Sequence, residues 1–291
     1  MSYLVTMRRR IKAVQTIKKI TSAMRLISRA FHIKMHKKHV ALINYQKELM
    51  HTFSFLHAQH PTWNPIHFSP KNTEQNAYQI FIIIGSQKGL CGTYNNDLVY
   101  WIDTHQKTLQ APHTHVIVIS KRLEEQCLKR NISLLKTTPE LTLSSLDNAT
   151  DMLFETLFKS SVCYTKALII SNKTQGFFKQ ELNKQQILPF LQTTMSNANT
   201  FAKRHTNYYW SHDADAVMNA CASLFIKNTL YTALFESLMG EQAARFISMD
   251  NATRNANNFL ETMQLQYNKA RQAKITKELT ELASAFESSF L

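Results

Sequence analysis

A glycine-rich stretch occupies the place at which α/β proteins often bind phosphate. Gly85–Gly92 (GSQKGLCG) follows the apolar run Ile80–Ile84 and precedes a helix-like segment. A P-loop needs Lys followed by Ser or Thr directly after its last glycine, and a dinucleotide-binding turn needs the spacing G-x-G-x-x-G. This stretch has neither, because three residues separate its first two glycines and no Lys-Ser or Lys-Thr follows Gly89 or Gly92. It therefore predicts a tight strand-to-helix turn without a nucleotide.

Cysteine and histidine offer two further chemistries. Cys91 in this turn could act as a nucleophile only beside a positioned base, and the sequence identifies none. His32, His36 and His39 would share one face of a helix, which is a spacing that metal sites use. No carboxylate or cysteine accompanies them, and lysines that repel a cation lie between them. We therefore expect a structural cysteine, a solvated basic helix face, and neither a metal nor another cofactor.

Acidic residues of the C-terminal part alternate with basic ones, which is typical of a solvated helix face. They include Glu236, Glu241, Asp250, Glu261, Glu278 and Glu281. No two of these carboxylates stand out as an acid–base pair. We expect no catalytic residue in this chain and a role other than that of an enzyme.

Positive charge is concentrated at the beginning of the chain. The net charge is +14 over 291 residues. Residues 1–50 contain twelve Lys and Arg against one acidic residue, whereas residues 214–291 contain seven basic and eight acidic residues. This basic segment predicts an acidic partner, which can be nucleic acid, anionic lipid or an acidic protein surface. The apolar runs are shorter than the ~18 residues of a membrane-spanning helix.

Both ends of the chain predict long helices. No proline or glycine occurs from Tyr3 to Leu56, and Gly240 is the only glycine from Ser211 to Leu291. Apolar residues recur every three or four positions in the first stretch: Ile11, Val14, Ile17, Ile20, Met24, Ile27 and Phe31. They do so again in the second: Met249, Ala256, Leu260, Met263, Tyr267, Ala270, Ile275, Leu279, Leu282 and Phe286. A single helix from Ser211 to Leu291 would be roughly 110–120 Å long, which is longer than a compact core can support. We therefore expect the two helices to pair as a coiled coil.

The middle of the chain predicts an α/β domain. Short apolar, β-branched runs at 80–84, 116–119 and 167–170 are separated by helix-like segments at 97–108, 122–130 and 149–164. Strands that alternate with helices imply a parallel sheet. Residues 172–210 look irregular, with one more strand expected at 207–210. The predicted organisation is an N-terminal helix at 1–56, an inserted, Rossmann-like α/β domain at 77–210, and a C-terminal helix at 211–291 that pairs with 1–56.

Three blocks resemble the gamma subunits of F-type ATP synthases. Residues 8–24 (RRRIKAVQTIKKITSAM) are similar to the opening helix of that family, and 89–92 (GLCG) to its glycine turn. Residues 241–256 (EQAARFISMDNATRNA) and 267–281 (YNKARQAKITKELTE) are similar to its C-terminal signature. Lys88, Thr93, Gly240 and Lys274 depart from the family's usual residues. The resemblance covers both ends of the chain and the turn after the first strand.

The resemblance implies a rotor shaft. In that family the terminal helices form an antiparallel coiled coil inside the hexamer of three alpha and three beta subunits. The α/β domain then sits with epsilon on the c-ring, the rotor ring of the membrane. Met24, Arg271, Gln272 and Thr276 should lie at or near the contact with the beta subunits. The chain would couple ion-driven rotation to ATP synthesis or hydrolysis, as a peripheral membrane protein at the cytoplasmic face of a bacterial inner membrane.

Two readings from other classes stay open at this point. A coiled-coil protein that binds nucleic acid would explain the basic N-terminal segment, and salt-sensitive DNA binding would favour it. A nucleotide-dependent enzyme would explain the α/β insertion, and ATP binding by the isolated chain would favour that class. The resemblance itself implies no nucleic-acid partner.

Overall fold

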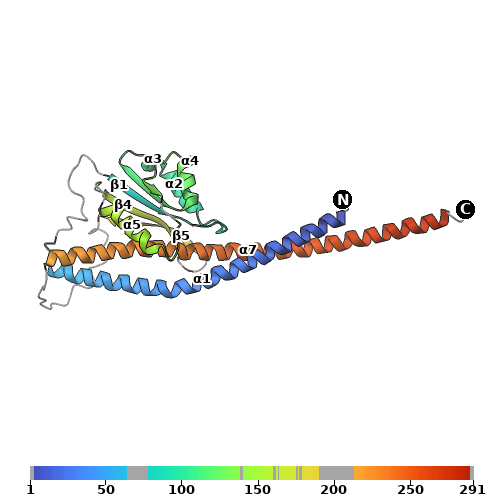
Figure 1. The fold of residues 1–291 in the computed structure, drawn as a ribbon, viewed down its shortest axis with the longest axis horizontal. Helices are drawn as coiled ribbons and strands as arrows, with labels where there is room; N and C mark the ends of the chain where they lie inside the picture. Colours follow the sequence, from blue (N-terminus) through green and yellow to red (C-terminus); the bar gives the residue numbers. More distant parts are fainter. Residues whose placement is uncertain are drawn as a thin grey trace. The chain divides into compact units, whose positions relative to one another are not determined.

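The computed structural model describes residues 3–63, 78–137, 140–159, 162, 164–174, 176, 179–189 and 213–288. Two long helices dominate it, α1 (Tyr3–Gln59) with 57 residues and α7 (Ala214–Ser288) with 75 (Figure 1). The chain divides into two compact units. Unit 1 comprises Met1–Arg29 and Arg245–Leu291, and unit 2 comprises Ala30–Ala244. Each helix contributes to both units.

Unit 1 is an antiparallel pair of helices. Arg25 Nη1 donates a hydrogen bond of 2.7 Å to Asp250 Oδ1, and Thr253 Oγ1 donates one of 2.9 Å to Thr21 Oγ1. Residue numbers along α1 therefore decrease in the direction in which they increase along α7, so the two helices run antiparallel. Buried positions on α7 alternate by four and three residues, at Met249, Thr253, Ala256 and Leu260. This is the spacing of a coiled-coil seam, and it confirms the predicted pairing.

The predicted apolar stripe of the N-terminal helix is only partly this seam. Buried positions on α1 in unit 1 repeat every seven residues or multiples of seven, at Met7, Thr21 and Ser28. Ile17, Ile20 and Ile27, which belong to the predicted stripe, are 52%, 55% and 67% exposed. The stripe steps mostly by three residues and so turns away from a seam with a period of 3.5. One apolar face of α1 therefore points outward.

Unit 2 contains a five-stranded sheet in the order β3-β2-β1-β4-β5. The strands are β1 (Tyr78–Ile84), β2 (Thr114–Ile119), β3 (Lys136–Thr137), β4 (Tyr164–Thr174) and β5 (Gln180–Leu188). β1 pairs in parallel with β2 and with β4, β2 pairs in parallel with β3, and β4 pairs antiparallel with β5. The three predicted strands correspond to β1, β2 and β4.

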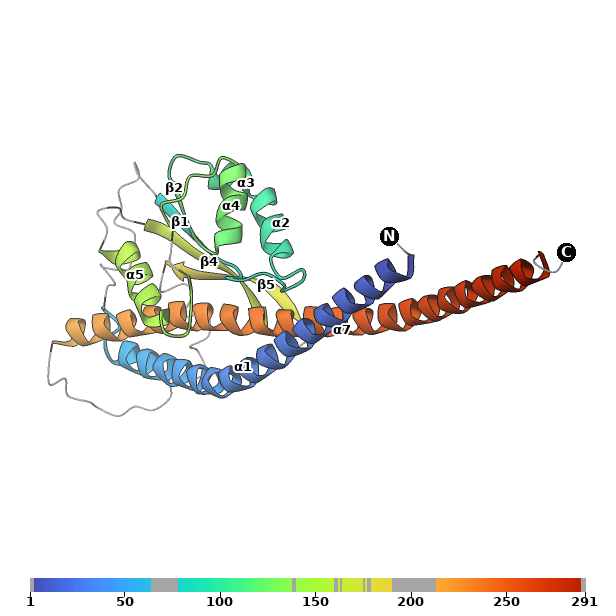
Figure 2. The same ribbon diagram turned by 45° about the vertical axis from the view of Figure 1, so that its right-hand side comes forward.

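Helices cover both faces of the sheet (Figure 2). α2 (Asn96–Thr104), α3 (Gln106–Leu109) and α4 (Lys121–Lys129) pack through Leu98, Leu109 and Leu123, respectively, on one face. α5 (Leu146–Phe158), α7 and α1 pack on the other. The helix predicted at 97–108 is broken at His105 into α2 and α3, and the one predicted at 149–164 ends six residues early, because Tyr164 begins β4.

The edge strand β5 was missed in the sequence. Its residues, QELNKQQIL, lack an apolar run because most of them lie half-exposed at the edge of the sheet. The strand predicted at 207–210 lies outside the described residues. The division at 1–56, 77–210 and 211–291 stays a prediction, whereas the fold class is as predicted. None of the helices in the described ranges combines the length and the apolar character needed to cross a membrane.

Candidate functional site

Three of the predicted contact residues lie where the helix pair of unit 1 ends. Arg271, Gln272 and Thr276 are all exposed on α7. Tyr3 begins α1, and the register of the Arg25–Asp250 pair places it opposite residue 272. Beyond that level every residue of α7 up to 285 is exposed. The three residues therefore mark the point at which α7 continues without α1.

Met24 lies elsewhere in unit 1. It is half-buried on α1 and adjacent in sequence to Arg25, which pairs with Asp250. Arg271 is twenty-one residues further along α7 than Asp250, or roughly 30 Å at 1.5 Å per residue. The structure therefore brings Arg271, Gln272 and Thr276 together, since Thr276 Oγ1 donates to Gln272 O at 3.0 Å, but it leaves Met24 apart from them.

The surface around Arg271 combines charge with exposed apolar residues. Lys274 and Lys277 pair with Glu278 and Glu281 at 3.4 Å and 3.6 Å along the helix. Arg271 makes no ion pair within the described part of the chain. Apolar side chains follow at high exposure: Ile275 (48%), Leu279 (61%) and Leu282 (58%). A free guanidinium beside an apolar stripe is a surface suited to a protein partner.

The stretch Gly85–Gly92 connects β1 to α2, as the sequence predicted. Leu90 and Gly92 adopt left-handed backbone angles, with φ of 62° and 58°. A Cβ at Gly85 would collide with Leu123 and lie 3.1 Å from the Cβ of Ser120. The Gln87 side chain donates from Nε2 to Ile119 O at 3.1 Å. Glycine is therefore needed at position 85 because Leu123 of α4 and Ser120 approach the backbone closely.

A carboxylate from the same chain fills this turn. Glu241 on α7 is 2% exposed, and its Oε2 and Oε1 accept hydrogen bonds from the backbone N–H of Gln87 at 2.8 Å and of Lys88 at 3.1 Å. The sequence analysis placed Glu241 on a solvated helix face, and that placement is wrong. Its partners lie more than 150 residues earlier, so no local pattern could have shown them.

Tyr94 and Cys91 complete the packing of α7 against the turn. The Tyr94 hydroxyl is hydrogen-bonded to Ser237 O at 3.0 Å and lies 3.1 Å from Ser237 Oγ. Burial raises the pKa of this hydroxyl far above its ordinary value. Cys91 is buried with Tyr94 and Ala244, and its Sγ lies 3.4 Å from Ser86 Oγ. The thiol is a packed structural group, as its sequence context indicated.

The sequence analysis expected His32, His36 and His39 of α1 to form one solvated face, and the structure shows that they do not. His32 is 7% exposed, and burial lowers its pKa, with smaller effects of His36 and His39 in the same direction. His39 Nε2 lies 2.9 Å from Glu236 Oε1, with both side chains mostly buried, and its ring stacks on Phe235. His36 alone of the three is exposed. In the ranges described, no three His, Cys, Asp or Glu side chains gather as a metal site.

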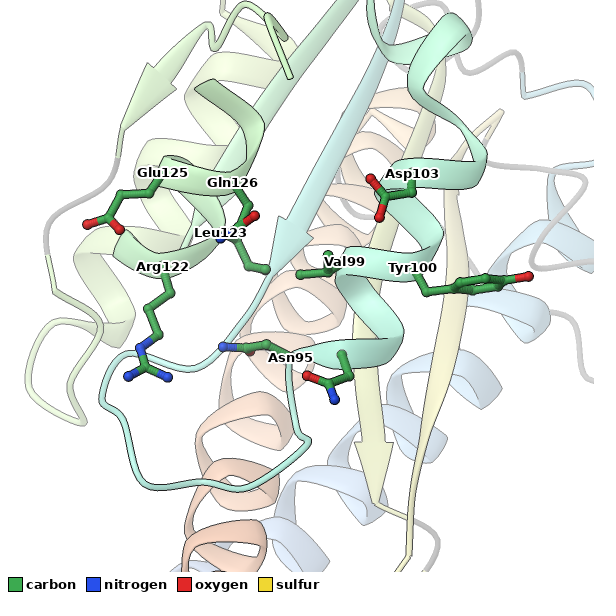
Figure 3. A pocket seen from close by; sticks show the side chains of 9 residues that line it. Asn95, Val99, Tyr100, Asp103, Arg122, Leu123, Glu125 and Gln126 are labelled. Atoms are coloured by element: carbon green, nitrogen blue, oxygen red, sulfur yellow. The ribbon is translucent and has the colours of Figure 1, made fainter. Parts of the chain in front are cut away.

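A cleft of about 560 Å³ opens between α2 and α4. Figure 3 shows Arg122 extending from α4 toward the loop that carries Gly89, while Tyr100 points away from the cleft. Asp103 at the rim is bound by Arg130, which holds the pKa of that carboxyl below its ordinary range. The lining side chains are Asn95, Asn96, Val99, Tyr100, Asp103, Arg122, Leu123, Glu125 and Gln126. They include no nucleophile beside a base, so the cleft offers no catalytic arrangement.

Comparisons with known proteins agree over nearly the whole chain. The sequence model of the ATP synthase family matches residues 4–288. The ATP synthase gamma chain of Rickettsia canadensis (strain McKiel) is 27% identical over 99% of both chains, and that of Halothermothrix orenii is 28% identical over 96% of both.

Solved structures share the fold. The central stalk with c-ring of the Tetrahymena thermophila mitochondrial ATP synthase matches 80% of this chain and 99% of its own, with a TM-score of 0.56 at 18% identity. A Euglena gracilis mitochondrial ATP synthase structure matches 92% and 95%, with a TM-score of 0.52 at 14% identity.

Proposed function

This chain belongs to the ATP synthase family as a gamma chain, a rotor subunit of the central stalk, and we propose how its residues serve that role. As a gamma chain it couples ion-driven rotation to the conformational cycle of the catalytic subunits. A shaft can do this only if its orientation changes the relative stability of its neighbours' conformations. The proposal therefore concerns which of its surfaces meet which neighbours.

The outward apolar face of unit 1 carries this proposal. Ile17, Ile20 and Ile27 on α1, and Leu265, Ile275, Leu279 and Leu282 on α7, are each close to half exposed or more. Exposed apolar surface on this scale is typical of a protein contact. Together with the basic residues 8–19 it suits a socket lined by apolar and acidic groups. The hexamer of alpha and beta subunits is such a socket in the family, and we assign unit 1 to it.

We assign the beta contact to Arg271, Gln272 and Thr276, with Met24 in a second contact further along unit 1. Arg271 has no acidic partner within the described residues, so its planar guanidinium is available to a carboxylate of another subunit. Met24 is half-buried in the helix pair. It can therefore touch a partner only with the edge of its side chain.

We infer that the chain itself is non-catalytic and holds no nucleotide. The backbone N–H groups of Gln87 and Lys88, which would face a phosphate, are occupied by the buried Glu241 carboxylate. No lysine or hydroxyl stands where a P-loop requires it. Titration of the full chain with Mg-ATP should give no measurable heat at micromolar protein. Micromolar affinity would contradict this inference.

We propose that the α/β sheet of unit 2 takes the contacts with epsilon and with the c-ring. The chain then lies peripheral to the membrane, at the cytoplasmic face in a bacterium. The Tetrahymena structure comprises the central stalk with its c-ring, which supports the ring as a partner. No nucleic-acid partner is proposed, because the exposed apolar face beside the basic residues fits a protein socket better than a phosphate backbone.

A pull-down with the tagged full chain tests the proposed function. Alpha and beta subunits of the same organism should be retained at physiological salt, and epsilon should join them. Retention of DNA that alpha and beta subunits do not displace would favour the nucleic-acid class instead. Failure to retain alpha and beta in the presence of Mg-ATP would refute the assignment of unit 1 to the hexamer.

A further inference from the structure

The turn after β1 presents two backbone donors to one carboxylate. Each oxygen of Glu241 accepts one N–H, from Gln87 at 2.8 Å and from Lys88 at 3.1 Å. Successive N–H groups that converge in this way form an anion-binding concavity, and the first turn of an α/β sheet is a common place for one. The group bound here is part of the chain itself.

The donors are held in place by bonds that do not involve Glu241. The Gln87 side chain donates to Ile119 O at 3.1 Å and accepts from the N–H of Leu141 at 3.2 Å. Ser86 N donates to Asn95 Oδ1 at 3.0 Å. The Lys88 ammonium points to Glu140 at 3.5 Å, so its charge is engaged outside the turn. The concavity is therefore organised by the sheet domain and should persist when the carboxylate is removed.

We propose that this turn is an oxyanion-binding site whose resident ligand is the Glu241 side chain, which fastens α7 to the sheet. The ligand class is a small carboxylate or another oxyanion of similar size. Replacing Glu241 with Ala removes a fragment with the shape of acetate. The turn should then accept acetate from solution, and inorganic phosphate is the probe that distinguishes a tetrahedral from a planar ligand.

Amide hydrogen exchange in the full chain tests this site directly. In Glu241→Ala the amides of Gln87 and Lys88 should exchange at least about tenfold faster than in the unaltered chain, because they lose a charged acceptor. Sodium acetate should restore their protection and raise the melting midpoint, whereas sodium chloride of equal ionic strength should do neither. The same exchange measurement is repeated with phosphate in place of acetate. Protection by either oxyanion supports the site.

A matched control is Glu140→Ala, which removes the carboxylate that meets the Lys88 side chain but leaves the backbone donors occupied. It should leave the exchange of Gln87 and Lys88 unchanged. If Glu241→Ala does not fold, Glu241→Gln keeps the volume with a neutral acceptor. Its two amides should still exchange faster, and acetate should have no effect because the space is filled. Unchanged exchange in the Gln variant, or protection by neither oxyanion in the Ala variant, would overturn the proposal.

The consequence for the rotor rests on the proposed function and is measured separately. In the assembled complex, Glu241→Gln should lower the number of ions pumped per ATP hydrolysed, because the sheet is held less firmly to α7. If the amides respond as expected but pumping per ATP is unchanged, the anion site stands and its mechanical role fails. If the variant chain does not join alpha and beta subunits that accept the unaltered chain, the fastening itself is needed for assembly.

Discussion

Unit 2 and unit 1 treat their apolar residues in opposite ways. In unit 2, Ile80, Ile82, Ile84 and Leu98 are fully buried by helices on both faces of the sheet. In unit 1, the apolar side chains can be buried only in the single seam between two helices. Thr21 and Ser28 occupy part of that seam. Unit 2 therefore closes its own core, whereas unit 1 leaves apolar surface exposed.

Polar groups show the same difference. Two acidic residues of α7 in unit 2, Glu236 and Glu241, are engaged by His39 and by the turn after β1. In unit 1, Glu261, Glu278 and Glu281 are exposed, whereas Asp250 is engaged by Arg25 across the helices. One continuous helix is thus a core element in unit 2 and largely exposed in unit 1. Variants in the two units should consequently separate effects on folding from effects on assembly.

The largest expected effect is on the folding of unit 2. Ile82→Ala should lower the free energy of unfolding by about 2–5 kcal/mol, since it leaves a cavity beneath fully buried neighbours. Leu279→Ala should change it by less than about 0.5 kcal/mol, because that side chain is 61% exposed. Urea unfolding followed by the fluorescence of Trp63 and Trp101 reports unit 2, and unfolding followed by circular dichroism reports the helices of both units.

Assembly should reverse the ranking of these two variants. Leu279→Ala should weaken binding to the alpha and beta subunits by about 1 kcal/mol or more, as an apolar contact residue does. Folded Ile82→Ala, below its unfolding transition, should bind them normally. Equal losses of stability for the two variants, or normal binding of Leu279→Ala, would contradict the division of roles between the units.

The next effect is on coupling at the end of the helix pair. Arg271→Ala together with Gln272→Ala should leave the chain folded and reduce ATP turnover and ion pumping of the assembled complex. Truncating one partner of a charged hydrogen bond at a desolvated contact costs about 2–5 kcal/mol. Matched reconstituted complexes give both rates.

Lys274→Ala is the control for general charge. Lys274 is 53% exposed and is already paired with Glu278, so its loss changes the local field without removing the contact. It should have a much smaller effect on both rates. Should the double variant match the unaltered complex, Arg271 and Gln272 belong to an ordinary helix surface.

Much of this fold could be predicted because its signals are local. β-branched runs predict β1, β2 and β4, and the absence of proline and glycine predicts α1. β5 escaped because Gln180–Leu188 lies at the sheet edge, where polar residues are favoured and no apolar run forms. The seam of α1 was misplaced because more apolar residues face outward than inward, as at Ile17 and Ile20.

The candidate site was harder to predict than the fold. The lack of P-loop residues could be seen in Gly85–Gly92, but the carboxylate that accepts its backbone N–H groups, Glu241, lies on a helix far along the chain. The pairing of His39 with Glu236 was hidden for the same reason. Arg271, Gln272 and Thr276 came from resemblance to a family. The structure places all three on the exposed surface of α7.

The smallest expected effect concerns the ion pair that crosses unit 1. The Arg25 guanidinium, and to a lesser extent Arg254, hold the pKa of Asp250 below its ordinary value of about 3.9. Because the folded-state pKa is the lower one, this stabilisation is present above pH 4 and is lost as pH falls through the folded-state pKa. Asp250→Asn should therefore cost about 0.2–1 kcal/mol at pH 7, and the difference from the unaltered chain should shrink below pH 4. Circular dichroism melting at several pH values measures it.

Arg254→Gln should cost less than Asp250→Asn, since Arg254 is 75% exposed and contributes less to the lowered pKa. A difference between Asp250→Asn and the unaltered chain that is the same at pH 7 and pH 3 would mean that the charge of Asp250 does not hold the helix pair together. The helix pair would then depend on its apolar seam alone. Unit 1 and unit 2 would both be held by apolar burial and would differ only in how much apolar surface they bury.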